Sequence, residues 1–484
     1  MNRLAVNHMR PYLLRETNSL MNRDRKTDQP SAPFRSAISQ GRAASIPAVL
    51  VLAVLPASST APAEAGPFLA VKGAGSANLV LKDNDFSRAG QDVVLGPDVP
   101  PAAVKRNPSG GWQHPGVRDR LPVFRERVAE RLTFPLSWPA WKERNGDDFE
   151  RWRKETRARV RERFLAAPPA APFAPEIVSS RKRDGFTAHK ITFNLTADSR
   201  VLACLLVPDG TGPHPAVLML HDHGAEFRIG KEKSVEPWDA PTEKTAVARK
   251  WVEKVYGGRF VGDELAARGY VVLVYDALNW SDRGGAGYDG QQALASNLLH
   301  LGMSFAGLIA HEDLRGAEFL ASRPEVDKSR IAAMGHSMGC FRAWQVAAMS
   351  DHIAAGVCCC WMATVKSLMV PGNNQTKGQS AFTMTHPGLF NDLDYPDVAS
   401  LACPKPMLFF AGEQDKLFPV PGVREAFAKM REVWKSRGAG DMLTTRLLPV
   451  PHQFNAAMQD EAFEWLDRQL RPQTTNQGQP KPRG

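Results

Sequence analysis

The segment Ile331-Ala-Ala-Met-Gly-His-Ser-Met-Gly-Cys-Phe-Arg-Ala-Trp-Gln-Val-Ala-Ala-Met349 contains, in order, a short apolar run, a glycine-bounded turn and an alanine-rich stretch. The first part predicts a buried strand and the last part a helix. Gly335 and Gly339 allow the backbone to pass close at a sharp turn, which lifts the Ser337 hydroxyl clear of the sheet. The pattern predicts that Ser337 is a nucleophile, and a structural turn serine is the alternative.

Apolar runs before and after this segment predict a large α/β sheet. From about residue 185, strands alternate with helices, which favours a mainly parallel arrangement. Residues 189–195 alternate between apolar and polar side chains and residues 200–207 follow closely, so the two predict an antiparallel edge hairpin. The other strands are apolar runs, as expected where helices cover both faces, except that the last begins with Thr445 and Arg446: residues 216–220, 270–275, 331–334, 354–360, 406–410 and 445–448. We therefore predict an α/β fold with a mostly parallel eight-stranded sheet and helices on both faces.

Helices and long connections are predicted between these strands. Residues 260–268 predict a helix that ends at Gly269, and residues 291–322 predict another that ends before Pro324. The connections 225–258 and 361–403 are too long for simple turns. Long connections at the active edge of a sheet commonly carry lids or substrate contacts.

A serine hydroxyl needs a base within hydrogen-bond reach and a third group that orients the base. Asp415 follows the strand that ends near residue 410, and His452 follows the last strand. The order Ser337, Asp415, His452 is the one expected for this strand-turn-helix arrangement. We predict that His452 is the general base and that Asp415 orients it.

Other residues compete for these two roles. Glu413 lies near Asp415, but Asp415 falls further into the loop, where it can turn toward an imidazole. His336 lies inside the glycine-bounded turn and is expected to point away from the serine's side. Three further histidines lie outside the final strand and loop: His221, His223 and His386.

The tetrahedral intermediate of acyl transfer needs backbone donors. The amide of Met338, directly after the nucleophile, should be one of them. The second should come from the loop Leu220-His-Asp-His-Gly-Ala225, where Ala225 is the first choice and Gly224 the second. Residues 221–223 can also be interpreted as metal ligands, but no further Cys, His or carboxylate set at ligand spacing supports this. We predict neither a metal nor a cofactor.

Residues 185 to 470 resemble the α/β-hydrolase superfamily, and most closely its dienelactone hydrolase and acetyl xylan esterase-like branch. The resemblance rests on these residues: Leu220-His-Asp-His-Gly224, Gly230-Lys-Glu-Lys233, Gly335-His-Ser-Met-Gly339, Gly412-Glu-Gln-Asp415 and His452. It implies the α/β-hydrolase fold, the catalytic triad and cleavage of esters without a cofactor. Dienelactone hydrolases use a cysteine nucleophile where this chain has Ser337, which favours ordinary carboxylic esters over lactones.

The expected activity is that of a serine esterase that forms an acyl-enzyme, with acetyl esters of carbohydrates as the expected substrates. Three tryptophans are candidates to stack on a sugar ring, although core packing is the favoured interpretation for each: Trp238, Trp280 and Trp361. A serine peptidase of the prolyl-oligopeptidase type is one rival, although residues 66–185 are too few for its propeller domain. A non-catalytic, hydrolase-like binding protein is another.

The N-terminal residues 1–65 predict a signal peptide with a long n-region. Residues 46–55 have the length of an apolar h-region, and Ala63-Glu-Ala65 is an A-x-A cleavage pattern. We therefore expect export to the periplasm or the exterior; a disordered tail with a chance apolar patch is the alternative. Residues 66–184 are predicted as a partly helical extension, 185–471 as the catalytic domain and 472–484 as a disordered tail.

Within the extension, Asp147-Asp148 offers a helix N-cap. The apolar residues that follow recur on one helical face: Phe149, Trp152, Val160 and Phe164. We expect this helix to cover one side of the main domain.

The charge and the cysteine content argue against a nucleic-acid-binding protein and against a disulfide-rich secreted domain. The formal charge is +10, but residues 1–65 carry eight Lys/Arg against four Asp/Glu, which leaves a modest +6 for the remainder. No nucleic-acid motif is present, so the expected partner is a small-molecule or saccharide ester. Cys358, Cys359 and Cys360 are consecutive in an apolar run, so we expect the six cysteines to be buried free thiols.

Overall fold

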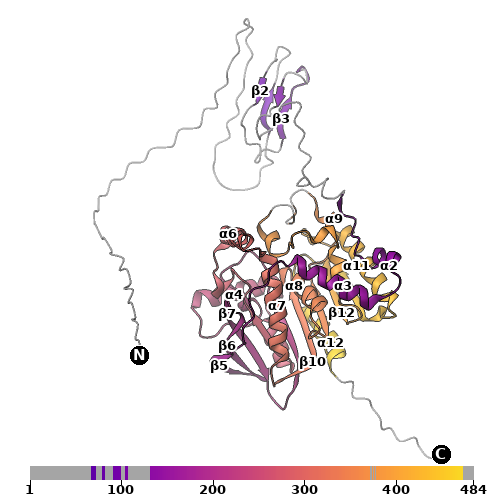
Figure 1. Cartoon of the computed structure of the whole chain (residues 1–484). Helices are drawn as coiled ribbons and strands as arrows, with labels where there is room; N and C mark the ends of the chain where they lie inside the picture. The colour runs from indigo at the N-terminus through magenta and orange to yellow at the C-terminus, as the bar shows by residue number, and fades with distance from the viewer. Residues whose placement is uncertain are drawn as a thin grey trace, which may run out of the picture. The chain divides into compact units, whose positions relative to one another are not determined.

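The computed structural model describes residues 67–71, 79–81, 91–99, 104–106, 131–370, 373, 375 and 378–471 (Figure 1). The chain divides into two compact units, residues 1–118 and 119–484. The predicted signal peptide, residues 1–65, and the predicted tail, residues 472–484, lie outside the described residues. Both therefore stay predictions.

The described residues of the first unit form two pairs of short parallel strands. Strand β1 (Pro67–Val71) pairs with β3 (Gln91–Leu95). Strand β2 (Leu79–Leu81) pairs with β4 (Val104–Arg106). These strands lie in a Gly- and Pro-rich part of the chain that shows no clear periodicity in the sequence.

A nine-stranded sheet organises the second unit, in the order β13-β12-β11-β10-β8-β9-β7-β6-β5. Strands β8 to β13 pair in parallel, whereas β5, β6, β7 and β9 pair in antiparallel fashion along one side. The bounds are β5 (Glu176–Arg183), β6 (Phe186–Thr196), β7 (Ser199–Pro208), β8 (His214–Leu220), β9 (Val271–Tyr275), β10 (Val326–His336), β11 (Ala355–Cys359), β12 (Met407–Gly412) and β13 (Leu443–Leu448).

The prediction of eight strands is wrong by one, because the sequence analysis missed β5. Its residues Glu-Ile-Val-Ser-Ser-Arg-Lys-Arg are mostly exposed, so no apolar alternation marks them as a strand. The predicted antiparallel hairpin is confirmed as β6 and β7, but β5 takes the edge position beside β6. The other predicted strands are all present.

Both faces of the sheet are covered by helices, as predicted. Alternate residues of the central strand β8 enter separate apolar clusters: Leu218 belongs to the cluster that contains α7 and α8, and Met219 to the cluster that contains α4, α5 and α12. The helix bounds are α2 (Trp138–Asn145), α3 (Phe149–Arg163), α4 (Thr242–Tyr256), α5 (Val261–Ala267), α6 (Gly287–His300), α7 (Phe305–Ala321), α8 (Met338–Met349), α9 (Val365–Leu368), α10 (Tyr395–Ser400), α11 (Val420–Ser436) and α12 (Ala456–Leu470).

The single helix predicted for residues 291–322 is wrong, since the structure has two helices there. Helix α6 ends at His300, and Gly302 adopts the left-handed conformation with φ of +69°. Ser304 then caps α7, because its hydroxyl accepts a hydrogen bond from the Gly307 amide at 3.0 Å. A glycine and a serine therefore divide one apolar pattern into two elements.

Helix α3 packs against the α8 side of the sheet and begins at the predicted N-cap, where Asp148 accepts from the Arg151 amide at 3.0 Å. Trp152 is fully buried in the same apolar cluster as α8. The Arg157 guanidinium donates to the Ala348 carbonyl at 2.7 Å. The last carbonyls of a helix have no partner within the helix, so α3 stabilises the C-terminal end of α8.

No helix in the described ranges combines the length and the apolar character that crossing a membrane requires.

The start of α10 contains a buried carboxylate that should make stability depend on pH. Asp397 accepts from the Asp394 amide at 2.9 Å and is 6% exposed. Burial and the neighbouring Asp394 carboxylate raise the pKa of Asp397 to about 7. Because this pKa lies above the value of about 3.9 in the unfolded chain, the contribution of Asp397 to stability is fully present below about pH 4 and is lost as the pH rises through about 7.

We expect Asp397→Asn to raise the free energy of unfolding at pH 8 by up to about 4 kcal/mol, because the amide keeps an acceptor oxygen and carries no charge. The gain should be smaller at pH 5, where the native carboxyl is protonated. Urea unfolding at both pH values measures this. Asp441→Asn, at an exposed position, is the control, and an equal gain at the two pH values would contradict the assignment.

Candidate active site

The predicted nucleophile lies at the turn between β10 and α8. Ser337 is the N-cap of α8, with φ of +55° and ψ of −123°. A non-glycine residue rarely adopts this conformation, and such strain is typical of functional sites. The Ser337 amide donates to the Cys359 carbonyl at 2.8 Å, which ties the turn to β11.

The two glycines of the turn are required by close backbone packing. A Cβ atom on Gly339 would lie 1.9 Å from the Leu220 carbonyl oxygen, and one on Gly335 would lie 2.3 Å from the carbonyl of Gly339. Both contacts are with backbone, which cannot move aside as a flexible side chain can. The turn therefore fits only if both positions lack a side chain.

Gly339→Ala should lower the free energy of unfolding by about 1–3 kcal/mol or more, because the added methyl group must push β8 away from α8. Thermal or urea unfolding measures the change. Gly440→Ala is the matched control, since a Cβ atom there meets nothing within 4 Å. Equal free energies of unfolding for Gly339→Ala and Gly440→Ala would contradict the close backbone contact described at Gly339.

The predicted base and its orienting carboxylate are hydrogen-bonded to each other. Asp415 Oδ2 and His452 Nδ1 are 2.6 Å apart, and Asp415 Oδ1 accepts from the Leu417 amide at 2.9 Å. The Asp415 side chain is 1% exposed. Glu413 points elsewhere: its side chain is 43% exposed and lies 3.4 Å from Arg424. Of the two candidates, only Asp415 contacts the imidazole.

Electrostatics at His452 favour its protonated form. Burial acts to lower the pKa of His452, but the hydrogen bond and the negative charge of Asp415 outweigh it, and the net effect raises the pKa. The hydrogen bond to Asp415 fixes a proton on Nδ1 and leaves Nε2 as the nitrogen that can accept another.

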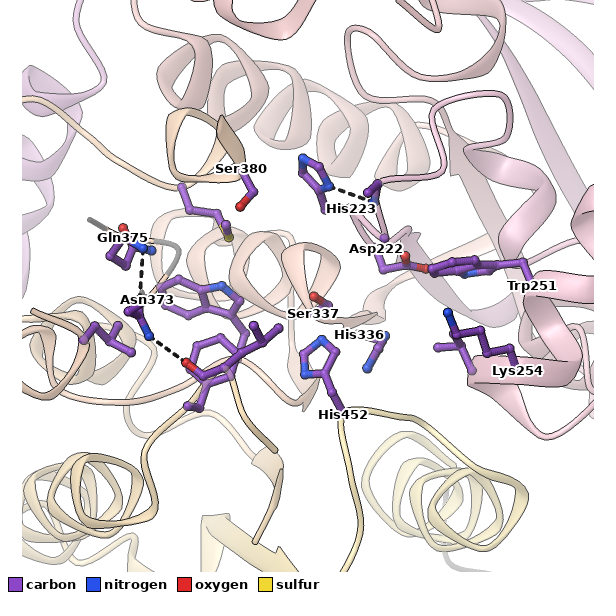
Figure 2. A pocket seen from close by; sticks show the side chains of 18 of the residues that line it. Asp222, His223, Trp251, Lys254, His336, Ser337, Asn373, Gln375, Ser380 and His452 are labelled. Carbon is purple, nitrogen blue, oxygen red and sulfur yellow. Dashed lines mark hydrogen bonds between the residues drawn. The ribbon is translucent and has the colours of Figure 1, made fainter. Parts of the chain in front are cut away.

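Ser337 and His452 line the same cavity, whose volume is about 300 Å³ (Figure 2). Both long connections contribute to its wall, where substrate contacts were predicted. Trp251 and Lys254 come from residues 225–258. The second connection supplies Trp361, Leu368, Asn373, Gln375, Ser380 and Met384. The wall is thus a mixture of aromatic, aliphatic and hydrogen-bonding side chains.

The residues proposed as an alternative metal site, 221–223, are engaged by protein groups instead. His221 Nδ1 lies 2.9 Å from the Asp222 carbonyl, and its Nε2 accepts from the Ala277 amide at 2.9 Å. Asp222 Oδ2 accepts from the Tyr256 hydroxyl at 2.6 Å. His223 contacts Gln291 at 2.9 Å. These bonds use the ligand atoms that a metal would need.

The motif Gly230-Lys-Glu-Lys233 holds the loop after β8 in place through hydrogen bonds and an ion pair. Lys233 is buried and donates to the Asp222 and His223 carbonyls, each at 2.9 Å. Burial opposes ionisation of Asp222, but the charge of Lys233, with smaller contributions from other groups, lowers the pKa of Asp222 to about 2. Lys231 pairs with Asp276 at 2.7 Å. The motif therefore fixes the loop after β8 rather than contacting the cavity.

The predicted oxyanion donors are only partly in place, because Met338 is not among the described residues that line the cavity. Met338 is the first residue of α8, where the helix N-terminus favours negative charge. Gly224 and Ala225 both line the cavity. The Ala225 amide donates to His223 Nδ1 at 3.1 Å, so in this conformation it is used within its own loop.

One expectation about an individual side chain is wrong. His336 does not point away from the serine's side: it lines the cavity, and its ring centroid lies 4.7 Å from that of His452. For Trp238 and Trp280 the favoured interpretation, core packing, is confirmed: both are buried and neither is among the residues that line the cavity. Trp280 donates to the His223 carbonyl at 3.1 Å. Of the three predicted tryptophans, Trp361 lines the cavity.

Sequence reasoning missed several wall residues, among them Trp251, Tyr288 and Phe418. Trp251 lies on α4 and Tyr288 on α6, two helices whose sequences do not mark which side faces the cavity. Phe418 stacks on the His452 ring, with centroids 6.0 Å apart. Its position three residues after Asp415 was the one available signal. The six cysteines are free and buried, as predicted.

Residues 140–432 match the model of the Abhydrolase family. The chain belongs to this family. This Abhydrolase-family protein is 26% identical over 304 residues to YtaP of Bacillus subtilis (strain 168), which is named provisionally as a hydrolase; the match covers 63% of this chain and 95% of YtaP.

Solved structures place the fold of this Abhydrolase-family protein among known ones. A protein of Bacteroides fragilis NCTC 9343, described provisionally as an acetyl xylan esterase, superposes with a TM-score of 0.53 at 17% identity over 69% of this chain and 83% of its own. A glucuronoyl esterase of Solibacter usitatus gives a TM-score of 0.47 at 16% identity over 67% and 94% of the two chains. The predicted α/β-hydrolase fold and family are confirmed.

Proposed function

We propose that the protein is a serine esterase that cleaves carboxylic esters through an acyl-enzyme. The observation that carries this proposal is the pair of His452 Nδ1 and Asp415 Oδ2 at 2.6 Å, with His452 and the strained Ser337 on one cavity wall. A serine, an oriented imidazole and a buried carboxylate are the parts that acyl transfer requires.

In the proposed reaction, Ser337 Oγ attacks the ester carbonyl while His452 Nε2 takes its proton. The amide of Met338, together with an amide of Gly224 or Ala225, stabilises the oxyanion. When the intermediate collapses, His452 returns the proton to the departing alcohol. A water molecule then attacks the acyl-enzyme with His452 again as base, which releases the acid and restores Ser337. Asp415 stays ionised throughout.

The proposed substrate is a small acyl ester, such as an acetyl group, on a carbohydrate or similar polar alcohol. A cavity of about 300 Å³ lies at the small end of ligand pockets. Trp251, Tyr288 and Trp361 offer aromatic faces at its wall, while Asn373 and Gln375 add amide groups. The description of the Bacteroides fragilis structure is in keeping with this choice.

A substrate comparison tests the proposal. The purified protein should hydrolyse p-nitrophenyl acetate faster than the butyrate and octanoate esters, and should leave p-nitroacetanilide intact. Cleavage of the anilide at the rate of the acetate would favour a peptidase. Folded protein that turns over no ester in the series would favour a hydrolase-like binding protein.

We also propose that the protein is exported and cleaved after Ala65, on the basis of the apolar run 46–55 and the A-x-A pattern. N-terminal sequencing of protein recovered from the periplasm or medium should begin at Gly66. Recovery of the uncleaved chain from the cytoplasm alone would contradict export.

A further inference from the structure

Three side chains beside Ser337 form a cluster that the esterase mechanism uses only in part. One ligand atom each from His336, Cys360 and His452 lie within 4.8 Å of one another. His336 belongs to the nucleophile turn, Cys360 directly follows β11, and His452 lies in the loop after β13. The parallel order of β10, β11, β12 and β13 brings these strand ends to one edge of the sheet.

The ring nitrogens of His221 and His223 are occupied by hydrogen bonds to protein groups, whereas the donor atoms of this cluster can still bind an ion. Both ring nitrogens of His336 are buried, and neither has a hydrogen-bond partner in the described part of the chain. A buried polar group without a partner is costly and calls for an explanation. His452 uses Nδ1 for Asp415 and keeps Nε2. Cys360 is 1% exposed, and its sulfur lies 3.5 Å from the Gln453 carbonyl and 3.7 Å from the Cys359 sulfur. The thiol also interacts with the His336 ring, the neighbour with which it would share the ion.

We propose that His336, Cys360 and His452 bind a zinc ion, and that the bound ion inhibits the enzyme. Two imidazoles and one thiolate suit Zn²⁺, whereas Mg²⁺ and Ca²⁺ prefer oxygen ligands. Three protein ligands leave the fourth tetrahedral position for water or the Ser337 hydroxyl. His336 and His452 line the cavity, which gives the ion a route of entry.

The geometry needs a small contraction. The three donor atoms now lie within 4.8 Å of one another. Zinc ligand atoms lie about 2.0–2.3 Å from the ion, so zinc binding would have to draw the donor atoms closer together by about 1 Å. The Cys360 thiol releases its proton to solvent when the ion binds, and both imidazoles bind as neutral rings. Asp415 already holds His452 Nδ1, which is the carboxylate–histidine arrangement that orients imidazole ligands at zinc sites.

The inhibition, which rests on the proposed function, follows from His452. A zinc ion on Nε2 occupies the lone pair that would take the proton of Ser337. Ester turnover and fluorophosphonate labelling should both stop when the ion is bound, and a chelator should restore both. Metal binding itself does not depend on the esterase assignment.

Co²⁺ spectroscopy on the full-length protein tests the site without an activity assay. The wild-type protein should show a thiolate-to-cobalt charge-transfer band that Zn²⁺ displaces. Loss of an outer-shell partner of a metal site costs about 10- to 100-fold in affinity, so loss of a ligand in Cys360→Ser should abolish the band and weaken Zn²⁺ binding by at least about 100-fold. His336→Gln should weaken binding in the same direction if the serine variant fails to fold.

Cys359→Ser is the matched control, because it removes the adjacent buried thiol, which is not one of the three donors. It should keep the band and the inhibition by Zn²⁺. Equal Co²⁺ affinity in wild type and Cys360→Ser, with no charge-transfer band, would overturn the site. A normal charge-transfer band in a protein that hydrolyses no ester would support the zinc site and contradict the proposed esterase function.

Discussion

Ser337→Ala should lose all labelling by a fluorophosphonate and at least about 10⁴-fold in kcat for acetate esters, while its thermal unfolding stays close to that of the wild type. Without the hydroxyl no acyl-enzyme can form, and only binding and the oxyanion donors remain. Intact mass spectrometry of the labelled proteins should show one adduct on the wild type and none on the variant.

Ser380→Ala serves as the matched control, because Ser380 supplies the other serine hydroxyl in the described cavity wall. This variant should still take one adduct. An adduct that persists on Ser337→Ala, or that disappears with Ser380→Ala alone, would assign the nucleophile to another residue.

Asp415→Asn should lower kcat by about 10⁴-fold with little change in stability or in KM. The asparagine can donate its amide to His452 Nδ1, which favours the ring tautomer with a proton on Nε2. That tautomer cannot accept the proton of Ser337. Steady-state kinetics on p-nitrophenyl acetate, with circular dichroism as a check of folding, measure the effect.

Glu413→Gln provides the comparison, since Glu413 lies on the same loop, is half-exposed and contacts Arg424 rather than the imidazole. It should retain nearly all of the wild-type rate. If Glu413→Gln lost as much activity as Asp415→Asn, the result would contradict the assignment of Asp415 as the carboxylate that orients His452.

The central strands and the turn at Ser337 could be predicted from sequence because their constraints are local. Continuous apolar runs identify strands covered on both faces, and two glycines around Ser337 identify a turn that accepts no Cβ atom. The positions of Asp415 and His452 follow from the rule that parallel strands end at the same edge. Their 2.6 Å contact is the expected consequence.

The features that could not be predicted depend on contacts between distant segments. Strand β5 is polar because it lies at an exposed edge, where it needs no apolar face. His336 packs edge-to-face against Tyr256 of α4, with ring centroids 5.6 Å apart, and nothing near His336 in the sequence announces this contact. The core position of Trp280 depends on the loop that it supports through the His223 carbonyl. In each case the sequence supplies the residue but not its neighbour.

The packing of α3 on α8 sets a lower limit to the fragment that can be expressed as an active enzyme. A gene shortened to start at residue 185 would expose the cavity left by Trp152 and would remove the Arg157 donor from the Ala348 carbonyl. Heat inactivation of the intact protein should therefore coincide with detachment of α3, because the C-terminal end of α8 loses its Arg157 donor when α3 leaves.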